Sequence, residues 1–139
     1  MEWMLMPYRR YADFSGRSRR KEYWMFALLQ LIVACVFYAL LFAGMPEMDA
    51  PGQIAQAPGA LFYAGFILFM IFALVSFIPS LAVTVRRLHD QDKSGWWILI
   101  EFVPFVGPLI LLIFMFMDGT PGPNRFGDDP KGSVGEAFA

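Results

Sequence analysis

Two long stretches of this chain contain no charged residue, and they limit its possible folds more than any other feature. Residues 23–43 and 60–85 lack Asp, Glu, Lys and Arg, and a third apolar run over 96–117 contains one charge, Glu101. A helix of about 20 residues, rising about 1.5 Å per residue, crosses the roughly 30 Å hydrocarbon core of a bilayer. The sequence therefore predicts an all-α integral membrane protein with three transmembrane helices.

The composition agrees with a single membrane domain. Of 139 residues, 58% are hydrophobic and 17% are charged, whereas soluble domains average about 45–50% and about 25%. The net charge of −1 indicates no affinity for nucleic acid, and we expect no nucleic-acid partner. We expect the first apolar run to be a retained anchor, because the basic segment before it exceeds the leader of a signal peptide.

Residues 1–21 form a basic segment that suits the membrane interface. They hold six of the eleven Lys and Arg residues, interleaved with aromatic side chains. Rings at headgroup level and cations near lipid phosphates favour such a position. Pro7 and Gly16 argue against one continuous helix. We expect an interfacial basic arm, with a solvated basic tail as the alternative.

The connections between the runs differ in character. Residues 44–59 are rich in Pro and Gly and have no basic residue, which predicts a loop, and Pro79 should kink the second run. The third run contains Pro104, Gly107 and Pro108, so it either crosses as one kinked helix or returns as a re-entrant hairpin. A hairpin would need other helices to shield its broken backbone from lipid, so we favour the single span.

The distribution of charge predicts the orientation. The arm and the polar hinge between the second and third runs hold nine Lys and Arg residues, the 44–59 loop none, and the tail over 118–139 two. By the positive-inside rule the N-terminus and the hinge are cytoplasmic. With three spans, the turn-rich tail would then lie outside.

The hinge carries the most distinctive side chains of the chain. They are Arg86, Arg87, His89, Asp90, Lys93, Trp96 and Trp97. Together with Arg17, Arg19 and Arg20 of the arm, these cations and indoles could engage an anionic membrane lipid or a partner protein at the cytoplasmic surface. The simpler interpretation is that the arginines only set the topology.

We expect no catalytic residue, no metal site and no cofactor. His89 is the only histidine, and no cysteine or serine nucleophile accompanies it in the sequence. Its neighbour Asp90 is expected to hold the imidazole or an arginine in a structural turn.

A stripe of hydroxyl residues follows the second run. Ser76, Ser80 and Thr84 recur at helical spacing, which favours close packing of a neighbouring helix. The alternative is a polar path that continues to Glu101, in which case the protein would be a small transporter or channel subunit. Glu101 is expected to form an ion pair with Arg86 or Arg87 rather than to relay protons.

Three motifs, in this order, make the chain similar to the domain of unknown function 805 family, the YhaH-like small bacterial inner-membrane proteins. They read FSGRSRRKEYW over 14–24, RRLHD over 86–90 followed by SGWW over 94–97, and GPNRFG over 122–127. The sequence departs from the family pattern at Gln91, Asp92 and Asp128. The resemblance implies a multi-pass protein of the bacterial inner (plasma) membrane and no particular activity.

The function that the sequence favours is therefore non-enzymatic engagement of anionic lipid or a partner through the hinge. A three-helix unit has little interior, which leaves room for a homo-oligomer.

Overall fold

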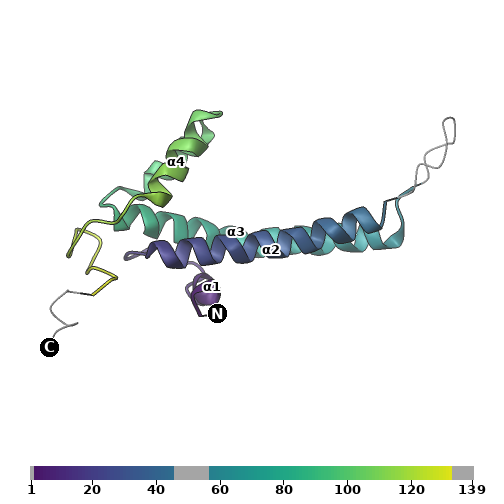
Figure 1. Ribbon diagram of the computed structural model, residues 1–139, viewed down its shortest axis with the longest axis horizontal. Helices are drawn as coiled ribbons and strands as arrows, with labels where there is room; N and C mark the ends of the chain where they lie inside the picture. The colour runs from purple at the N-terminus through teal and green to yellow at the C-terminus, as the bar shows by residue number, and fades with distance from the viewer. Residues whose placement is uncertain (1, 46–56, 133–139) are drawn as a thin grey trace. The chain divides into compact units, whose positions relative to one another are not determined.

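The computed structural model describes residues 2–45 and 57–132, and this part of the chain is helical, with one isolated β-bridge and no strand. The elements in order are α1 (Glu2–Arg9), α2 (Arg20–Ala43), α3 (Ala60–Asp90), the 3₁₀-helix η1 (Gly95–Phe102) and α4 (Val106–Phe116) (Figure 1). They fall into two compact units. The first comprises Met1–Ala27 and Ile78–Ala139, and the second comprises Leu28–Phe77.

Helices form over both uncharged runs. α2 has 24 residues and α3 has 31, and both are long and apolar enough to cross a membrane. Large apolar side chains on them are exposed, with 60% of Leu31 and 70% of Phe42 and Leu74 accessible. Such surface is costly in water but is well solvated by lipid tails, which are as apolar as leucine. α3 continues through Pro79 and past residue 85 to Asp90, so the hinge arginines are helical.

In the second unit the two helices pack through aromatic rings. The ring of Phe37 lies 5.9 Å from that of Phe69 and 5.8 Å from that of Phe72, measured between centroids. A Cβ atom at Gly65 would lie 3.4 Å from Cβ of Leu40, so glycine lets the helices approach closely there. Most of the loop predicted over 44–59 lies outside the described residues.

The first unit has its own small core. Leu88, Leu111 and Met115 are buried together, and Tyr23, Trp24 and Ile98 pack against them. α1 contacts α2 through the ring of Tyr8, which meets Phe26 edge-on with centroids 5.3 Å apart. The arm is not one continuous helix: α1 ends at Arg9, and the chain turns at Gly16 with a φ of 75°.

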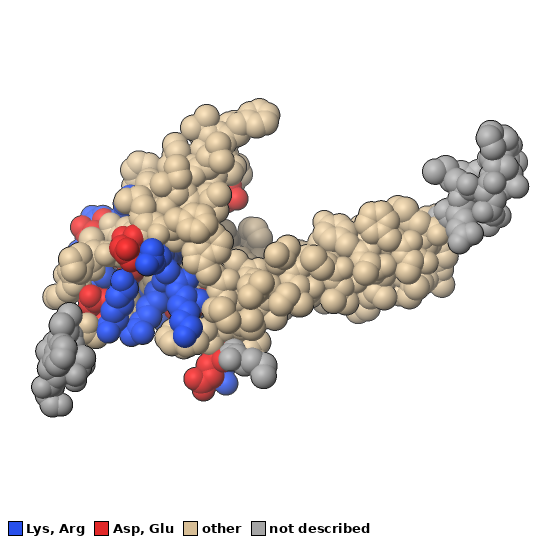
Figure 2. All heavy atoms as spheres, in the orientation of Figure 1, with Lys and Arg blue, Asp and Glu red and all other residues tan. Residues whose placement is uncertain are grey.

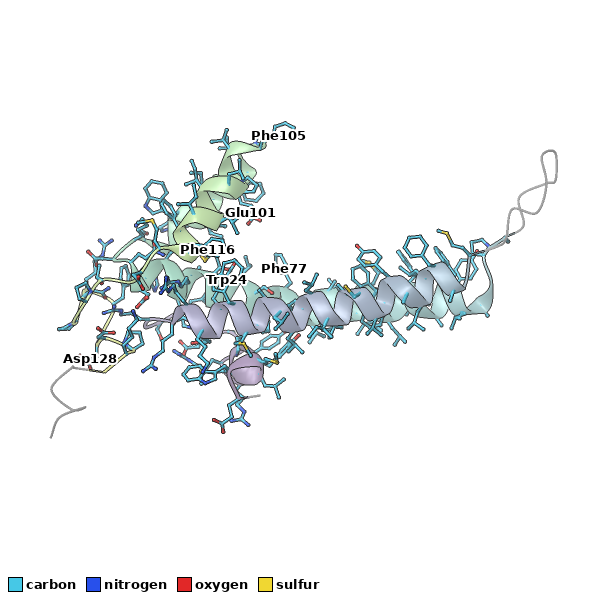
Figure 3. All side chains as sticks on the ribbon, in the orientation of Figure 1. Trp24, Phe77, Glu101, Phe105, Phe116 and Asp128 are labelled. Atoms are coloured by element: carbon cyan, nitrogen blue, oxygen red, sulfur yellow. The ribbon has the colours of Figure 1, made fainter. Side chains whose placement is uncertain are left out.

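The third apolar run does not form the single kinked helix that we favoured. η1 ends at Phe102, the chain turns over residues 103–105, and α4 packs back against η1, with Phe105 at the tip (Figure 3). Pro104 and Pro108 have no N–H to continue a helical ladder. Gly107 allows the contact, because a Cβ atom there would overlap the carbonyl oxygen of Ile100. The alternative hairpin is therefore the geometry that the structure adopts.

The tail also differs from the prediction. Nδ2 of Asn124 donates to the carbonyl of His89 at 2.9 Å, and Arg17 donates to the carbonyl of Thr120 at 2.6 Å. The tail therefore lies beside both the hinge and the arm, a contact that does not agree with an arm and a tail on opposite sides of a membrane. The hairpin makes this contact possible, because α4 returns the chain to the end of α3 at which η1 began.

Candidate functional site

A cluster of buried charged side chains lies where α2 begins and α3 ends. Nη2 of Arg86 donates to Oε1 of Glu22 at 2.9 Å, and the two side chains are 0% and 4% exposed. Nη1 of Arg86 also donates to the backbone carbonyl of Asp13. This contact joins the arm, α2 and α3 at one point.

Asp90 is the second carboxylate of this cluster. We call the cluster, formed by Arg17, Glu22, Arg86, Arg87 and Asp90, the polar cluster. Its Oδ1 accepts from Nε of Arg17 at 2.9 Å, and its Oδ2 accepts from Arg87 one helical turn earlier. Its backbone carbonyl accepts from the N–H of Thr120 at 2.8 Å. Gly119 passes so close that a Cβ atom there would overlap the carboxylate. Asp90 therefore fixes the arm to the end of α3 through its side chain and the tail through its backbone carbonyl.

The polar cluster contains three guanidiniums and two carboxylates, all buried. Backbone carbonyls supply further acceptors, including those of Thr120 and Gly122, which each accept from Arg17 at 2.6 Å. A buried charge is tolerated only when its hydrogen bonds are largely made. The hinge arginines and Arg17 thus make internal contacts, and their direct binding of a lipid stays a prediction.

The C-terminal end of α4 is capped by side chains from other elements. Its last intrahelical bond runs from the N–H of Met117 to the carbonyl of Ile113, and four further carbonyls would lack partners. Each accepts one side-chain donor: Gln91 donates to Phe114, Trp24 to Met115, Arg20 to Phe116 and Arg87 to Met117. Two of these donors are cations, which the negative end of a helix dipole favours.

His89 lies at the edge of the cluster and contacts both the arm and the tail. Its ring stacks on Phe126 with centroids 3.9 Å apart and planes 4° from parallel. Its Nδ1 lies 3.2 Å from the carbonyl oxygen of Gly16. Nearby, Arg125 pairs with Asp92 at 3.1 Å.

Basic side chains that remain accessible gather at the first turn of α2. We call this surface, formed by Trp3, Arg19, Arg20, Lys21 and Trp24, the basic ledge. Charged side chains gather on the first unit, whereas the described residues of the second unit show no charged side chain in this view (Figure 2). Arg19 and Lys21 lie over the ring of Trp3, at 5.7 and 5.5 Å from its centroid.

An open pocket of about 260 Å³ lies within the basic ledge. Arg20, Lys21, Trp24 and Phe116 line it, and the last two rings lie side by side with centroids 4.4 Å apart (Figure 3). Arg20 shares Asp118 with Lys131, at 2.9 and 3.3 Å. Two cations thus share one carboxylate, and with Lys21 also lining the pocket the balance of charge there stays positive.

The remaining hinge residues face α4 or solvent. The ammonium of Lys93 lies 4.7 Å from the ring centroid of Phe114, and Trp97 meets the same ring edge-on at 5.5 Å. Trp96 points away, with 78% of it exposed. The oxygen of Ser94 accepts from the N–H of Trp96 and caps η1.

The residues predicted to form a polar path lie on two elements, three of them on α3 and Glu101 on η1. The hydroxyl of Thr84 donates to the carbonyl of Ser80 within α3, Ser76 is buried, and Glu101 is exposed on η1. Glu101 makes no ion pair with any residue in the described ranges. The predicted pairing of Glu101 with a hinge arginine is wrong, because Glu22 and Asp90 already hold both guanidiniums.

Two exposed carboxylates have lowered pKa values. The hydroxyl of Ser15 and the guanidinium of Arg10 donate to Asp13 and lower its pKa to about 2. The backbone N–H groups of Lys131 and Gly122 donate to Asp129 and lower its pKa. Both carboxylates order turns, one in the arm and one in the tail.

Sequence reasoning missed two members of the polar network. Glu22 and Gln91 are buried, yet neither was assigned a role. A signal for Glu22 exists, because an ionisable residue beside an apolar span is expected to have a partner. Across residues 2–45 and 57–132, no three His, Cys, Asp or Glu side chains come close enough to hold a metal ion.

Long helices with exposed apolar side chains and a charged cluster at one end define an all-helical integral membrane protein. The chain belongs to the family described as "Protein of unknown function (DUF805)", which matches residues 11–128. The resemblance seen in the three sequence motifs is thus confirmed.

Curated relatives extend over nearly the whole chain. It is 43% identical to inner membrane protein YhaI of Escherichia coli (strain K12) over 132 residues, covering 94% of this chain and 97% of the relative. It is equally similar to inner membrane protein YhaH of the same strain, over 131 residues that cover 94% and 98%. The uncharacterized protein YiiR is 28% identical, with 86% of each chain covered. No solved structure matches.

Proposed function

We propose that this chain is a non-enzymatic protein of the bacterial inner membrane that holds an anionic lipid at its cytoplasmic surface. The observation that carries the proposal is the basic ledge, in which Arg20 and Lys21 border a pocket walled by Trp24 and Phe116. The names of the curated relatives YhaI and YhaH support the inner-membrane location.

The charge distribution supports a cytoplasmic position for the first unit. Once the tail is joined to the hinge and the arm, all eleven Lys and Arg residues belong to that unit, and the 44–59 loop has none. The positive-inside rule then favours a cytoplasmic arm, hinge and tail. In this topology α2 and α3 span the membrane, and η1 and α4 enter it as a re-entrant hairpin.

The basic ledge suits a lipid phosphate in both charge and depth. Its cations lie on the first turn of α2, immediately before the apolar part of the helix, where headgroups are found. Trp24 and Phe116 offer apolar surface for the start of an acyl chain. A Lys or Arg near an anionic leaflet contributes about 1 kcal/mol.

The polar cluster supports a non-catalytic role. Arg17, Arg86, Arg87 and Asp90 hold elements together through hydrogen bonds to one another and to the backbone. The charged side chains most suited to acid–base chemistry thus have structural contacts. No observation favours the alternative of a transporter or channel subunit.

Native mass spectrometry of the gently solubilised protein tests the proposal. We expect wild type to retain phosphatidylglycerol or cardiolipin, and the Arg20→Ala/Lys21→Ala variant to lose most of it. The Arg9→Ala/Arg125→Ala variant, which removes two other exposed cations, is the matched control and should retain the lipid. Equal retention in all three proteins would refute the proposal, and the same spectra count the subunits of any homo-oligomer.

A further inference from the structure

The hinge contains a second pocket that the basic ledge does not use. It is open, has a volume of about 350 Å³, and is lined by Val85, His89, Ser94, Gly95, Trp96 and Ile98. We call it the hinge pocket. None of the residues that line the hinge pocket belongs to the polar cluster. The ligand that would fit the hinge pocket is therefore determined by the pocket's own lining residues.

The hydrogen bond at Nδ1 of His89 determines which ring nitrogen can accept a hydrogen bond in the hinge pocket. Nδ1 lies 3.2 Å from the carbonyl oxygen of Gly16, and a carbonyl can only accept. In the neutral imidazole, Nδ1 therefore carries the proton and Nε2 has a free lone pair. Nε2 lies on the pocket side, because a Cβ atom at Gly95 would be 3.4 Å from it.

The other walls of the hinge pocket are mostly apolar. Val85 and Ile98 contribute aliphatic surface, and Trp96 presents an indole that is 78% exposed. Ser94 adds a hydroxyl, whose oxygen accepts from the N–H of Trp96. A ligand that fits these walls has an apolar part and a hydrogen-bond donor.

The charges around the hinge pocket favour a neutral donor over a cation. No carboxylate lines the pocket, so a bound ammonium would have no counter-ion there. The nearest basic side chains have other partners, since Lys93 lies over the ring of Phe114 and Arg125 pairs with Asp92. A hydroxyl group satisfies Nε2 without requiring a counter-charge.

We propose that the hinge pocket binds a hydroxyl-bearing lipid headgroup, with the hydroxyl donating to Nε2 of His89 and the carbon skeleton lying against Trp96, Val85 and Ile98. This site is distinct from the basic ledge, which would contact phosphate rather than hydroxyl. The inference rests on the proposed interfacial position of the hinge, but not on any lipid bound at the basic ledge. A free polyol offers the same hydroxyl chemistry and is tested separately.

His89 is the only histidine in the chain, so labelling with ¹⁵N-histidine gives one unambiguous pair of ring resonances. The protein, carrying no histidine tag, is placed in nanodiscs of phosphatidylcholine, whose headgroup has no hydrogen-bond donor. The spectra are recorded at pH 8, where an imidazole with an ordinary pKa of about 6.5 is neutral. Phosphatidylglycerol, phosphatidylmethanol, phosphatidylethanolamine or free glycerol is then added.

We expect Nδ1 to be protonated and Nε2 to be unprotonated before any addition. Phosphatidylglycerol should move the Nε2 resonance upfield, as hydrogen bonding to a ring lone pair does. Phosphatidylmethanol, which has the same charge without a hydroxyl, should leave it unchanged. A shift with glycerol alone would keep the hydroxyl chemistry but assign it to a diffusible polyol.

Variants separate the hinge pocket from the rest of the hinge. Trp96→Ala removes an exposed wall and should raise the midpoint of the phosphatidylglycerol titration about ten-fold, which corresponds to ~1.4 kcal/mol. Trp97→Ala, whose ring faces Phe114 outside this pocket, is the matched control and should not change the midpoint. The Nδ1 resonance reports whether each variant keeps its fold.

Several outcomes would overturn the inference. They are a proton on Nε2 at the start, equal shifts with phosphatidylglycerol and phosphatidylmethanol, a shift only with phosphatidylethanolamine, and no shift at all. The proposed function fails by a different result, equal lipid retention in wild type and both variants in native mass spectrometry, so the two failures are distinguishable.

Discussion

Arg86 on α3 and Glu22 on α2 form a buried ion pair with 2.9 Å between Nη2 and Oε1. The guanidinium belongs to a stretch that sequence reasoning assigned to the surface, yet its side chain is 0% exposed. The pair lies within the first unit, between the first turn of α2 and the last turns of α3. It therefore holds the arm, the hinge and the start of α2 in one arrangement.

Breaking this pair should be costly. Arg86→Ala leaves Glu22 buried without its counter-ion, and removing one partner of a buried pair costs about 3–5 kcal/mol. We expect a large loss of thermal stability in detergent. The double variant Glu22→Leu/Arg86→Met, which removes both charges, should recover much of it.

Arg9→Ala serves as the control for that experiment. Arg9 is exposed, and surface substitutions usually change stability by no more than about 0.5 kcal/mol. If Arg86→Ala unfolded at the same temperature as Arg9→Ala, the ion pair would have no structural role.

The hairpin of η1 and α4 depends on Gly107. An alanine there would overlap the carbonyl oxygen of Ile100, so Gly107→Ala should separate the two segments or unfold them. We expect a lower melting temperature and faster proteolysis near residues 103–105. Gly59→Ala, whose Cβ atom would lie 3.6 Å from the nearest atom, should behave like wild type.

Topology can be tested with single cysteines. In a Cys35→Ala background, Glu2→Cys in α1 and Asp128→Cys in the tail place thiols at exposed positions. Because the tail contacts the arm, a membrane-impermeant maleimide should label both positions from the same side. Inside-out vesicles should react and spheroplasts should not. Labelling of the two positions from opposite sides would restore the three-span topology and contradict the hairpin.

The stabilising contribution of ionised Asp13 in the arm should be lost only in strong acid. The pKa of Asp13 is lowered to about 2 by the Ser15 hydroxyl and by Arg10, whereas in the unfolded chain it is near 3.8. A lowered pKa in the folded state means that the contribution is fully present above about pH 4 and is lost as the pH falls through about 2. The carboxyl ¹³C resonance of Asp13 in NMR should titrate near pH 2.

Asp13→Asn provides the comparison. It should lower stability at pH 7, and the difference from wild type should shrink as the pH approaches 2. A midpoint near 3.8 for Asp13 in the folded protein would show that the contacts with Ser15 and Arg10 do not form.

The helices could be foreseen because their cause is local. Residues 23–43 and 60–85 have no charge over a length that crosses a bilayer, and any backbone in lipid must satisfy its own hydrogen bonds. The break at Pro104 and Gly107 was also visible, as both residues disturb a helical ladder. Which of the two foreseen outcomes this break produces was not decided by the sequence, since a kinked span and a hairpin share the same sequence signals.

The sequence alone determined that this chain is helical, is suited to a membrane, and carries nine of its eleven Lys and Arg residues in the arm and the hinge. Only the tertiary structure decided which of those cations remain free. Arg17, Arg86 and Arg87 are buried because Glu22, Asp90 and carbonyls of the tail, up to 105 residues away in the chain, come within hydrogen-bond distance. Partners that distant are brought together by the hairpin and the packing of Leu88 against Met115, and no local pattern records such contacts.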